Sequence, residues 1–373
     1  MNQALSIRFF AHSWISDWNH GNAHFLRGLA RELVIAGHQV RCYEEIGAWS
    51  LSNLMDEGEA GRCAIDDFHR IYPELDVLFY RRDETLPAFL NRELAGADLV
   101  IIHEWNEPDV VHEILSRKRR LGFRALFHDT HHRAYSNASQ ILRFQLHLFD
   151  GVLAFGESIR RIYLDGFGVE RAWTFHEAAD ISVFHPIERG KENDLVWIGN
   201  WGDEERTQEL MEFLVEPAMH LTAARRRVLV HGVRYPEQAT DTLRRSGIDY
   251  AGYLANLGVP EVYARSRLAL HVPRRQYANG LSGVPTIRVF EALACGIPLV
   301  CAPWADTEEL FRPGQDYVLA RDAAEMRVLL GELLASESMR RQIAASGLET
   351  IRQHHTCKHR AGQLMEIFGE ITR

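Results

Sequence analysis

Residues 268–303 constrain the fold more than any other stretch of the sequence. They contain an apolar run of strand length, a loop rich in glycine, a short helical pattern at 287–295 that ends at Gly296, and a second apolar run. This order predicts a βαβ unit whose loop lies at the carboxyl end of the first strand. Open α/β sheets bind ligands at that edge. We therefore expect a ligand site at this loop.

The side chains of this loop suit a nucleoside diphosphate. Thr286 stands where it can cap the helix, and a helix N-terminus favours an anion such as a diphosphate. Arg288 and Glu291 are three positions apart and so share one face of the helix. A cation for phosphate beside a carboxylate for ribose hydroxyls indicates a nucleotide clamp. An ordinary surface salt bridge explains the same spacing equally well.

Apolar runs of strand length recur along the chain and alternate with helical patterns. They fall at residues 6–12, 39–44, 76–80, 98–103, 124–127, 151–155, 172–176, 195–198, 228–231 and 249–251. This alternation predicts an α/β fold with parallel sheets, in which the polar residues after each run line one rim. Residues 47–68 show no regular pattern, and the opening loop at 14–22 lacks the full G-x-G-x-x-G fingerprint.

The chain length of 373 residues suggests two domains rather than one. The charged segment at 188–194 is the predicted linker between them. We therefore expect a Rossmann-like N-terminal domain at residues 1–187, a Rossmann-like C-terminal domain at 188–354, and a C-terminal helix within 355–373.

Composition narrows the class of protein. No stretch approaches the ~18 consecutive apolar residues of a membrane span, and the first residues do not resemble a signal peptide, so we expect a soluble cytoplasmic protein. The five cysteines are scattered and form no C-x-x-C pair, which argues against a disulfide framework and against structural zinc. The net charge of −9 argues against a nucleic-acid partner.

The densest basic run has two interpretations. It comprises Arg117, Lys118, Arg119, Arg120 and Arg124. Such a run can contact anionic lipid or a charged glycan, which would place the protein at the inner face of a membrane. It can equally be a solvated helix end whose cations suit the helix dipole.

A histidine-rich segment follows the run at 124–127. His128, Asp129, His131 and His132 lie within five positions, but their spacing matches no zinc motif and consecutive side chains diverge, so no metal is expected. A histidine at the carboxyl end of a strand is better suited to hydrogen bonding or proton transfer. Polar residues beside other predicted strands of the N-terminal half are expected to line a substrate pocket, namely His20, Gly21, Asn22, His103 and Glu104.

The loop and helix at 283–296, set in the second of two Rossmann-like halves, resemble those of GT-B glycosyltransferases. The resemblance is to the family 4-like group and its branch related to the spore maturation protein CgeB. Residues 36–40 are similar to the G-H-x-V after the first helix of that family, and residues 178–186 to its G-x-D…F-x-P exit from the first domain. His355, Thr356 and Arg360 resemble the H-T…R near the end of the branch.

The resemblance implies a GT-B fold, in which two Rossmann-like domains face a central cleft and the C-terminal helix packs back on the N-terminal domain. It implies that the C-terminal domain binds a nucleotide sugar and that the N-terminal domain binds the acceptor. Glu291 matches the second Glu of the E-x7-E motif, which binds ribose hydroxyls, whereas the first Glu falls on Gly283. Residues 199–206 occupy the place of the phosphate-binding turn, with Asn200 where its Arg is expected and Arg206 one position beyond its Lys.

His128 and Asp129 coincide with the H-D of that family, where the histidine approaches the reacting sugar, and are the predicted catalytic residues. The predicted donor-binding residues are Gly199, Asn200, Arg206, Tyr253, Val284, Pro285, Thr286, Ile287, Arg288 and Glu291. The expected activity is transfer of a sugar from a nucleoside diphosphate sugar to a glycan, lipid-linked or protein acceptor, with no cofactor and no metal. The base, such as uracil or guanine, and the oligomeric state stay open.

Three alternatives remain on the same sequence. A nucleotide-sugar epimerase of the same fold would need acid and base groups on both sides of one sugar carbon. A catalytically inactive protein that binds sugar nucleotides is favoured by the missing first Glu. A DNA-modifying glucosyltransferase is disfavoured by the acidic charge balance.

Overall fold

The computed structural model describes residues 4–373. They form two compact units: the first runs to Glu177 and includes Cys357–Arg373, and the second is Ala178–Thr356. The first unit thus ends before the predicted border at 187, because the backbone N–H of Ala179 donates to the carbonyl of His355 (2.9 Å) and ties this segment to the second unit. The C-terminal segment likewise begins at 357 rather than 355.

The first unit is built on a seven-stranded parallel sheet with strand order β3-β2-β1-β4-β5-β6-β7. The strands are β1 (Ser6–Phe10), β2 (Gln39–Glu45), β3 (Asp76–Tyr80), β4 (Leu99–His103), β5 (Arg124–Asp129), β6 (Gly151–Ala154) and β7 (Ala172–Thr174). All residues of β4 and β6 are buried, as expected of apolar runs covered on both faces. The direction of the strand order reverses between β1 and β4, which makes the carboxyl ends of these two strands the natural ligand crevice of the unit.

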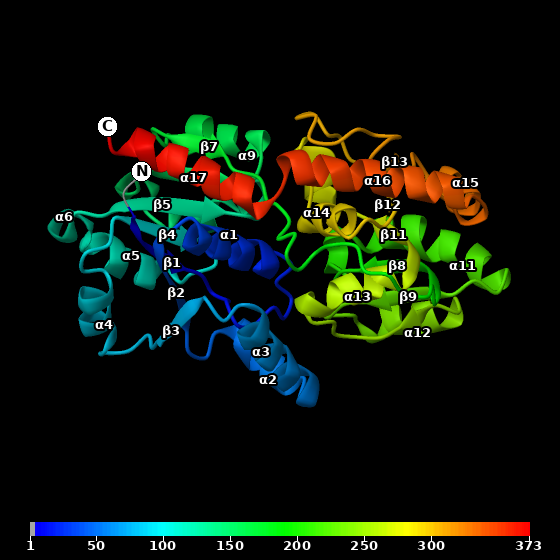
Figure 1. Cartoon of the computed structure of the whole chain (residues 1–373), viewed down its shortest axis with the longest axis horizontal. Helices are drawn as coiled ribbons and strands as arrows, with labels where there is room; N and C mark the ends of the chain where they lie inside the picture. Colours follow the sequence, from blue (N-terminus) through cyan, green and yellow to red (C-terminus); the bar gives the residue numbers. More distant parts are fainter. Residues whose placement is uncertain (1–3) are drawn as a thin grey trace. The chain divides into compact units, whose positions relative to one another are not determined.

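Helices flank this sheet (Figure 1). They are α1 (Ala23–Ile35), α2 (Trp49–Asp56), α3 (Glu59–Ile71), α4 (Leu86–Glu93), α5 (Pro108–Ser116), α6 (Lys118–Leu121), α7 (Arg133–Ser136), α8 (Ala138–Leu142) and α9 (Glu157–Arg161). The region at 47–68, which has no regular sequence pattern, is largely helical. The α3 helix buries Gly61, Ala64 and Phe68, and Gly61 packs so close to the carbonyl of Leu54 that a Cβ would clash with it.

The C-terminal helix α17 (Cys357–Ile371) packs on the first unit, as the GT-B resemblance implies (Figure 1). Arg360 Nε donates to the carbonyl of His176 (2.7 Å), and Gln363 Nε2 donates to the carbonyl of Thr174 (2.8 Å). Nearer its end, Glu370 accepts a hydrogen bond from Trp173 Nε1 (2.8 Å). The helix therefore covers the β7 edge of the first sheet although it follows the second unit in sequence.

The second unit is built on a six-stranded parallel sheet with strand order β10-β9-β8-β11-β12-β13. The strands are β8 (Asn193–Ile198), β9 (Val228–His231), β10 (Asp249–Tyr250), β11 (Ser266–His271), β12 (Leu299–Cys301) and β13 (Val318–Leu319). The helices are α10 (Thr207–Leu210), α11 (Glu216–Ala223), α12 (Glu237–Arg245), α13 (Val259–Ala264), α14 (Ile287–Ala294), α15 (Ala323–Ala335) and α16 (Glu337–His354). The β11-α14-β12 segment is the predicted βαβ unit, and the order of this sheet reverses between β8 and β11.

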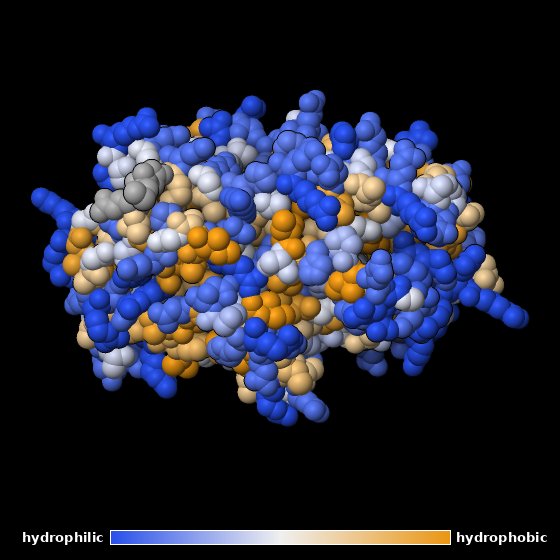
Figure 2. All heavy atoms as spheres, viewed as in Figure 1, coloured by the Kyte–Doolittle hydropathy of each residue, from blue (hydrophilic) through white to orange (hydrophobic). Residues whose placement is uncertain are grey.

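No helix within residues 4–373 is long and apolar enough to cross a bilayer, and the face in Figure 2 is mostly hydrophilic with hydrophobic residues interspersed. In the basic run, Arg117 pairs with Glu113 (2.7 Å), and Lys118 and Arg124 both pair with Asp150 (2.8 and 3.2 Å). Most of these cations therefore serve the first unit itself.

Candidate active site

The carboxyl ends of β8 and β11 are joined by Arg206. Its Nη1 donates to the carbonyl of Val272 after β11 (3.1 Å), and its Nη2 donates to the backbone and side-chain oxygens of Asn200 after β8 (both 2.6 Å). Predicted donor residues Asn200 and Arg206 are thus in contact. They lie where the strand order reverses, which is where open α/β sheets bind ligands.

Arg206 is a buried cation that lacks a direct carboxylate partner among the described residues. Its hydrogen bonds go to carbonyl and amide oxygens, its guanidinium lies 4.9 Å from the Trp197 ring centroid, and its buried Nε has no partner. Burial, followed by the nearby Arg274, lowers the pKa of Arg206 to about 9. The nearby Glu205 pairs instead with Arg274. A bound anion would therefore stabilise Arg206.

Two glycines allow the backbone after β8 and β9 to come together. A Cβ on Gly232 would clash with the carbonyl oxygen of Gly199, and a Cβ on Gly199 would clash with the Trp197 ring. Tyr235 donates its hydroxyl to the same carbonyl of Gly199 (2.9 Å). Close packing beside the crevice therefore requires glycine at position 199, a predicted donor residue. It also requires glycine at position 232, which the sequence analysis missed.

The start of α14 differs in detail from the prediction. Thr286 is the N-cap residue, but its hydroxyl does not bond to the helix amides. Instead, Thr286 Oγ1 lies 3.0 Å from His271 Nε2 at the end of β11. Burial and the nearby Arg206 lower the pKa of His271 to about 3, so the ring is neutral at physiological pH. The side chain of Thr286 therefore leaves the helix N-terminus uncapped.

The other residues predicted in this loop contribute through the backbone. Val284, Pro285 and Ile287 are buried, so their side chains pack inside the unit. Proline has no backbone N–H, and Pro285 therefore cannot supply the amide that a phosphate would bind. Val284 and Ile287 keep that capability.

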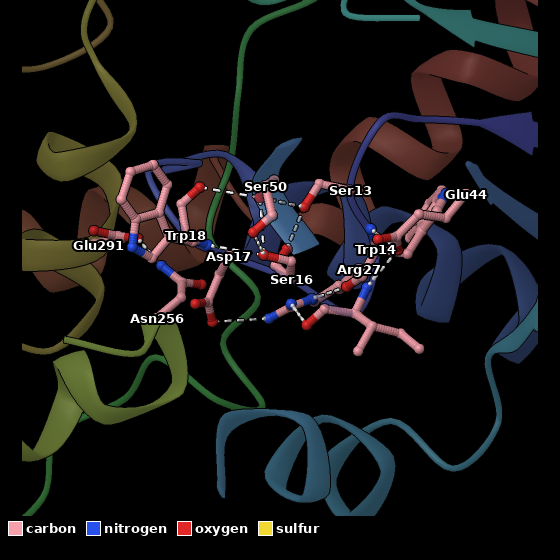
Figure 3. Close-up of polar contacts among 11 residues, drawn as sticks. Ser13, Trp14, Ser16, Asp17, Trp18, Arg27, Glu44, Ser50, Asn256 and Glu291 are labelled. Atoms are coloured by element: carbon pink, nitrogen blue, oxygen red, sulfur yellow. Dashed lines mark hydrogen bonds and ion pairs between the residues drawn. The ribbon is translucent and has the colours of Figure 1, made fainter. Parts of the chain in front are cut away.

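Glu291 is fully buried within the second unit, and both of its carboxylate oxygens are engaged. Oε1 accepts a hydrogen bond from Asn256 Nδ2 (3.0 Å), as Figure 3 shows, and Oε2 pairs with Arg288. The Arg288–Glu291 pair is therefore not a surface salt bridge. Asn256 was missed by the sequence analysis; the predicted donor residue Tyr253 stands three positions before it, in the loop after β10.

In the first unit, three histidines gather at the carboxyl ends of β1 and β4. The ring centroid of His12 is 4.3 Å from that of His20 and 5.7 Å from that of His103. All three are buried. Burial, followed by the charge of Arg133, lowers the pKa of His12 to about 3. Burial is also the main cause that holds the pKa values of His20 and His103 well below the usual range.

These rings are consequently neutral at physiological pH and have nitrogens without hydrogen-bond partners. Both ring nitrogens of His20 and the Nδ1 atoms of His12 and His103 are buried and unpartnered. Trp49 and Trp105 flank His12 at 5.9 and 6.0 Å between ring centroids. The predicted acceptor residues His20 and His103 are thus brought together, and His12 joins them. The sequence analysis did not assign His12 to the site. Its position just after the first strand was the signal that could have indicated it.

Two of the remaining predicted acceptor residues, Asn22 and Glu104, contact the loop after β5, and an acceptor role for them and for Gly21 stays a prediction. Glu104 is buried, accepts a hydrogen bond from the N–H of Thr130 (2.9 Å) and pairs with Arg133 (2.7 Å). Asn22 Nδ2 donates to the carbonyl of Thr130 (3.4 Å), and Gly21 is half-buried beside it. Glu104 therefore has a structural role that the prediction did not foresee.

The predicted catalytic residues occupy a position below the edge of the sheet. His128 has no exposed surface, and its ring lies about 6 Å from those of Phe9 and Phe25 (both 6.0 Å between centroids) and 5.8 Å from that of Phe175. Both of its nitrogens lack a hydrogen-bond partner, and burial lowers its pKa to about 3. This enclosure is that of a packed imidazole. A direct catalytic role for His128 stays a prediction.

Asp129 does not hold the ring of His128. Its carboxylate accepts hydrogen bonds from the hydroxyl of Tyr163 (2.6 Å) and the backbone N–H of His131 (2.9 Å). Burial, with the charge of Glu104 next in size, raises the pKa of Asp129 well above its usual value. These contacts fix the histidine-rich loop. No group of three or more metal-ligating side chains within residues 4–373 is arranged to hold a metal ion.

A charged clamp fixes the loop after β1 (Figure 3). Arg27, which is fully buried, donates to the carbonyls of Trp14 (2.8 Å) and Ile15 (2.9 Å), and its Nη1 lies 3.6 Å from Asp17 Oδ2. Glu44 accepts from the N–H groups of the same two residues (2.6 and 2.9 Å). The backbone N–H and C=O groups of Trp14 and Ile15 are thus all hydrogen-bonded to buried side chains, which fixes the loop.

Comparison with known proteins agrees with this architecture. Residues 206–366 match the family model described as glycosyl transferase-like. No match to a curated protein was found. The matched region contains Arg206 and the whole β11-α14-β12 segment, and so covers much of the candidate donor site.

Solved structures with similar folds extend the likeness to the whole chain. HepE from Anabaena in complex with UDP and glucose has a TM-score of 0.70 at 13% identity, with 98% of this chain and 99% of that chain covered. An α-glucosyltransferase in complex with UDP and DNA has a TM-score of 0.70 at 11% identity, with 98% and 100% covered. Sucrose-phosphate synthase from Thermosynechococcus elongatus has a TM-score of 0.62 at 12% identity, with 99% of each chain covered. At these identities the likeness shows the fold.

The two sheets and the similar solved structures define the fold of this protein. The chain has the GT-B fold of these glycosyltransferases, and its residues 206–366 are similar to a glycosyl transferase-like family. Enzymes of this class transfer a sugar from a nucleotide sugar to an acceptor. No finding bears on the narrower CgeB-related branch.

Proposed function

We propose that the second unit binds a UDP-sugar and that the enzyme transfers its sugar to a hydroxyl group of an acceptor held by the first unit. The observation that carries this proposal is Arg206, a buried cation at the switch point of the second sheet without a carboxylate partner of its own. A diphosphate is an anion of suitable charge for that position. The choice of UDP is supported by similar folds solved with UDP, such as HepE.

The donor would be held by positively charged groups at its diphosphate and by a carboxylate at its ribose. Arg206, Arg288 and the N-terminus of α14 would bind the diphosphate and stabilise the charge that develops on it as the sugar leaves. Glu291, positioned by Asn256, would accept hydrogen bonds from the ribose hydroxyls. These cations and amides supply charge stabilisation from the protein itself, and we propose that the reaction uses no cofactor.

The acceptor would bind at the histidine edge of the first unit. The rings of His12, His20 and His103 are neutral and can accept a hydrogen bond or a proton from a hydroxyl group. Trp49, which is 41% exposed, offers an aromatic face beside His12. Aromatic faces next to neutral polar groups suit the alternating C–H and O–H surfaces of a glycan, which we propose over a lipid-linked or protein acceptor.

Two other partners receive less support. Membrane contact through Arg117–Arg124 would have to use cations of which three are already paired within the first unit. DNA occurs with the similar α-glucosyltransferase, but the net charge of −9 in this chain opposes binding to a polyanion.

The test begins with nucleotides. Thermal-shift measurements with UDP, GDP, ADP and dTDP should show the largest stabilisation with UDP, and UDP-sugars should then be hydrolysed slowly without acceptor. Glu291→Gln should weaken UDP binding by about 1–3 kcal/mol, the range for a hydrogen bond to a charged group, while leaving the affinity for inorganic pyrophosphate unchanged.

Glu325→Gln, a change on an exposed ion pair of the same unit, is the matched control and should bind UDP as the unmodified protein does. Equal loss of UDP and pyrophosphate affinity in Glu291→Gln would remove Glu291 from the ribose site. Conversion of the donor to an isomer in the absence of acceptor would indicate an epimerase instead.

A further inference from the structure

Gly283, which stands where a carboxylate residue is expected from the family resemblance, is packed against the loop that follows β12. Its backbone N–H donates to the carbonyl of Ala305 (2.7 Å), and its φ of +82° favours glycine. A Cβ at this position would lie 2.7 Å from Thr307 Oγ1, 2.9 Å from Glu308 Cγ and 3.0 Å from Glu308 Oε1. The carboxylate of Glu308 therefore lies where a side chain on residue 283 would begin.

The loop that carries Glu308 is fixed by its own contacts. Asp306 accepts hydrogen bonds from the backbone N–H groups of Leu310 (3.1 Å) and Phe311 (2.8 Å). Glu309 has a φ of +54°, a conformation that non-glycine residues adopt only when their surroundings impose it. The carbonyl of Leu310 lies 3.0 Å from His355 Nε2. Glu308 is thus presented by a backbone with one defined conformation.

Charge decides what Glu308 can bind. Gly283 directly precedes the residues at 284–287 that lead into α14, where the diphosphate is proposed to lie. A carboxylate next to a diphosphate repels it, but the same carboxylate is a strong acceptor for the hydroxyl groups of a neutral sugar. The donor sugar is bonded to the terminal phosphate and so must lie within hydrogen-bonding reach of groups that border the diphosphate loop.

We propose that Glu308 binds hydroxyl groups of the donor sugar and thereby helps to select it. This inference rests on the proposed donor site, and it adds a residue from the β12 loop to that site. The carboxylate missing at position 283 is supplied by a residue 25 positions later in the sequence. Glycine at 283 is then the consequence, because any side chain there would displace Glu308.

The test compares nucleotide with nucleotide sugar. Calorimetry on the full chain would measure Kd for UDP and for the UDP-sugar that the unmodified enzyme hydrolyses, using Glu308→Gln, Glu308→Ala and the unmodified protein. We expect UDP affinity to stay within about twofold and the affinity for the UDP-sugar to fall ~10-fold or more, which corresponds to the loss of hydrogen bonds to a charged group. The kcat for hydrolysis of the donor should fall with it.

Glu309→Gln is the matched control, because Glu309 is the exposed neighbour in the same loop and its amide variant keeps the side-chain length. It should bind both ligands as the unmodified protein does. If the Glu308 variants bind and hydrolyse the UDP-sugar normally, or if they lose UDP and UDP-sugar affinity equally, Glu308 does not bind the sugar. If the unmodified protein binds no nucleotide, the proposed function itself fails, so the two failures are distinguishable.

Discussion

The two units share one sheet plan but differ in the charge at its functional edge. In each, the strand order reverses beside the first strand of the unit, at β1 and β4 in one and at β8 and β11 in the other. The second unit places Arg206, a buried cation, at that point, whereas the first places the neutral rings of His12, His20 and His103 there. The difference teaches that one scaffold can present a cation or neutral polar rings at the same edge through the residues that follow its strands.

The sharpest way to break this comparison is to remove the cation. Arg206→Ala should weaken UDP binding by about 2–5 kcal/mol, because it deletes the charge that faces the diphosphate, while binding of the nucleoside uridine should change far less. Calorimetry with both ligands measures the difference. Arg206→Lys keeps the positive charge but loses the planar set of guanidinium donors. Its affinity for UDP should therefore lie between those of Arg206→Ala and the unmodified protein.

Arg206 also joins β8 to β11, so its variants need a folding control. The melting temperature without ligand reports any structural loss, and Arg244→Ala, which removes an exposed arginine of the same unit, should leave UDP binding unchanged. Equal loss of uridine and UDP affinity would show that Arg206 acts only through structure.

The second test asks which histidine of the first unit takes part in turnover. Replacing His12 by Ala should lower kcat by ~100-fold with UDP affinity unchanged, because its ring lies at the edge beside Trp49 and Trp105. His128→Leu preserves the volume of a ring enclosed by phenylalanines and breaks no hydrogen bond. We therefore expect that variant to keep its turnover.

The contrary result would support the predicted catalytic role of His128. A ~100-fold loss of kcat in His128→Leu, with the melting temperature and UDP affinity unchanged, would show that this ring reaches the reacting groups. His147→Ala, an exposed histidine of the same unit, serves as the control.

The sequence predicted most strands because they are compact apolar runs, but it missed the two-residue strand β13. It also indicated Arg206 and Glu291 as candidate donor residues, Arg206 through the family resemblance and Glu291 through the loop and helix at 283–296, and their roles stay predictions. It missed α3, whose only large buried apolar residue is Phe68. The helical spacing is present, because Gly61, Ala64, Ile65 and Phe68 recur on one face, but three of these four residues are not large aromatic or leucine side chains.

The parts of the site that could not be predicted depend on contacts between distant segments. Asn256 meets Glu291 from a loop 35 positions away, and Glu308 approaches Gly283 from the next crossover. The surroundings of His128 could not be predicted for a related reason. Its place at the end of an apolar run is shared by exposed and by enclosed residues, and only the packing of Phe9, Phe25 and Phe175 distinguishes them.

The smallest expected effect concerns how the edge of the first unit is held. Burial raises the pKa of Glu44 to about 7 although two backbone N–H groups and Arg27 oppose this. Between pH 4.5 and 7 the unfolded chain loses this proton while the folded protein keeps it, so the contribution of Glu44 to stability falls as pH rises, by at most about 1.4 kcal/mol per pH unit.

Glu44→Gln keeps an acceptor for the N–H groups of Trp14 and Ile15 and removes the titration. Urea unfolding at several pH values should therefore show the difference in unfolding free energy between the variant and the unmodified protein growing with pH over this window, whereas Glu59→Gln, an exposed site of the same unit, should follow the unmodified protein. A constant difference for Glu44→Gln would mean that folding does not raise the pKa of Glu44, and that an ionised carboxylate accepts the N–H groups of Trp14 and Ile15 throughout this pH window.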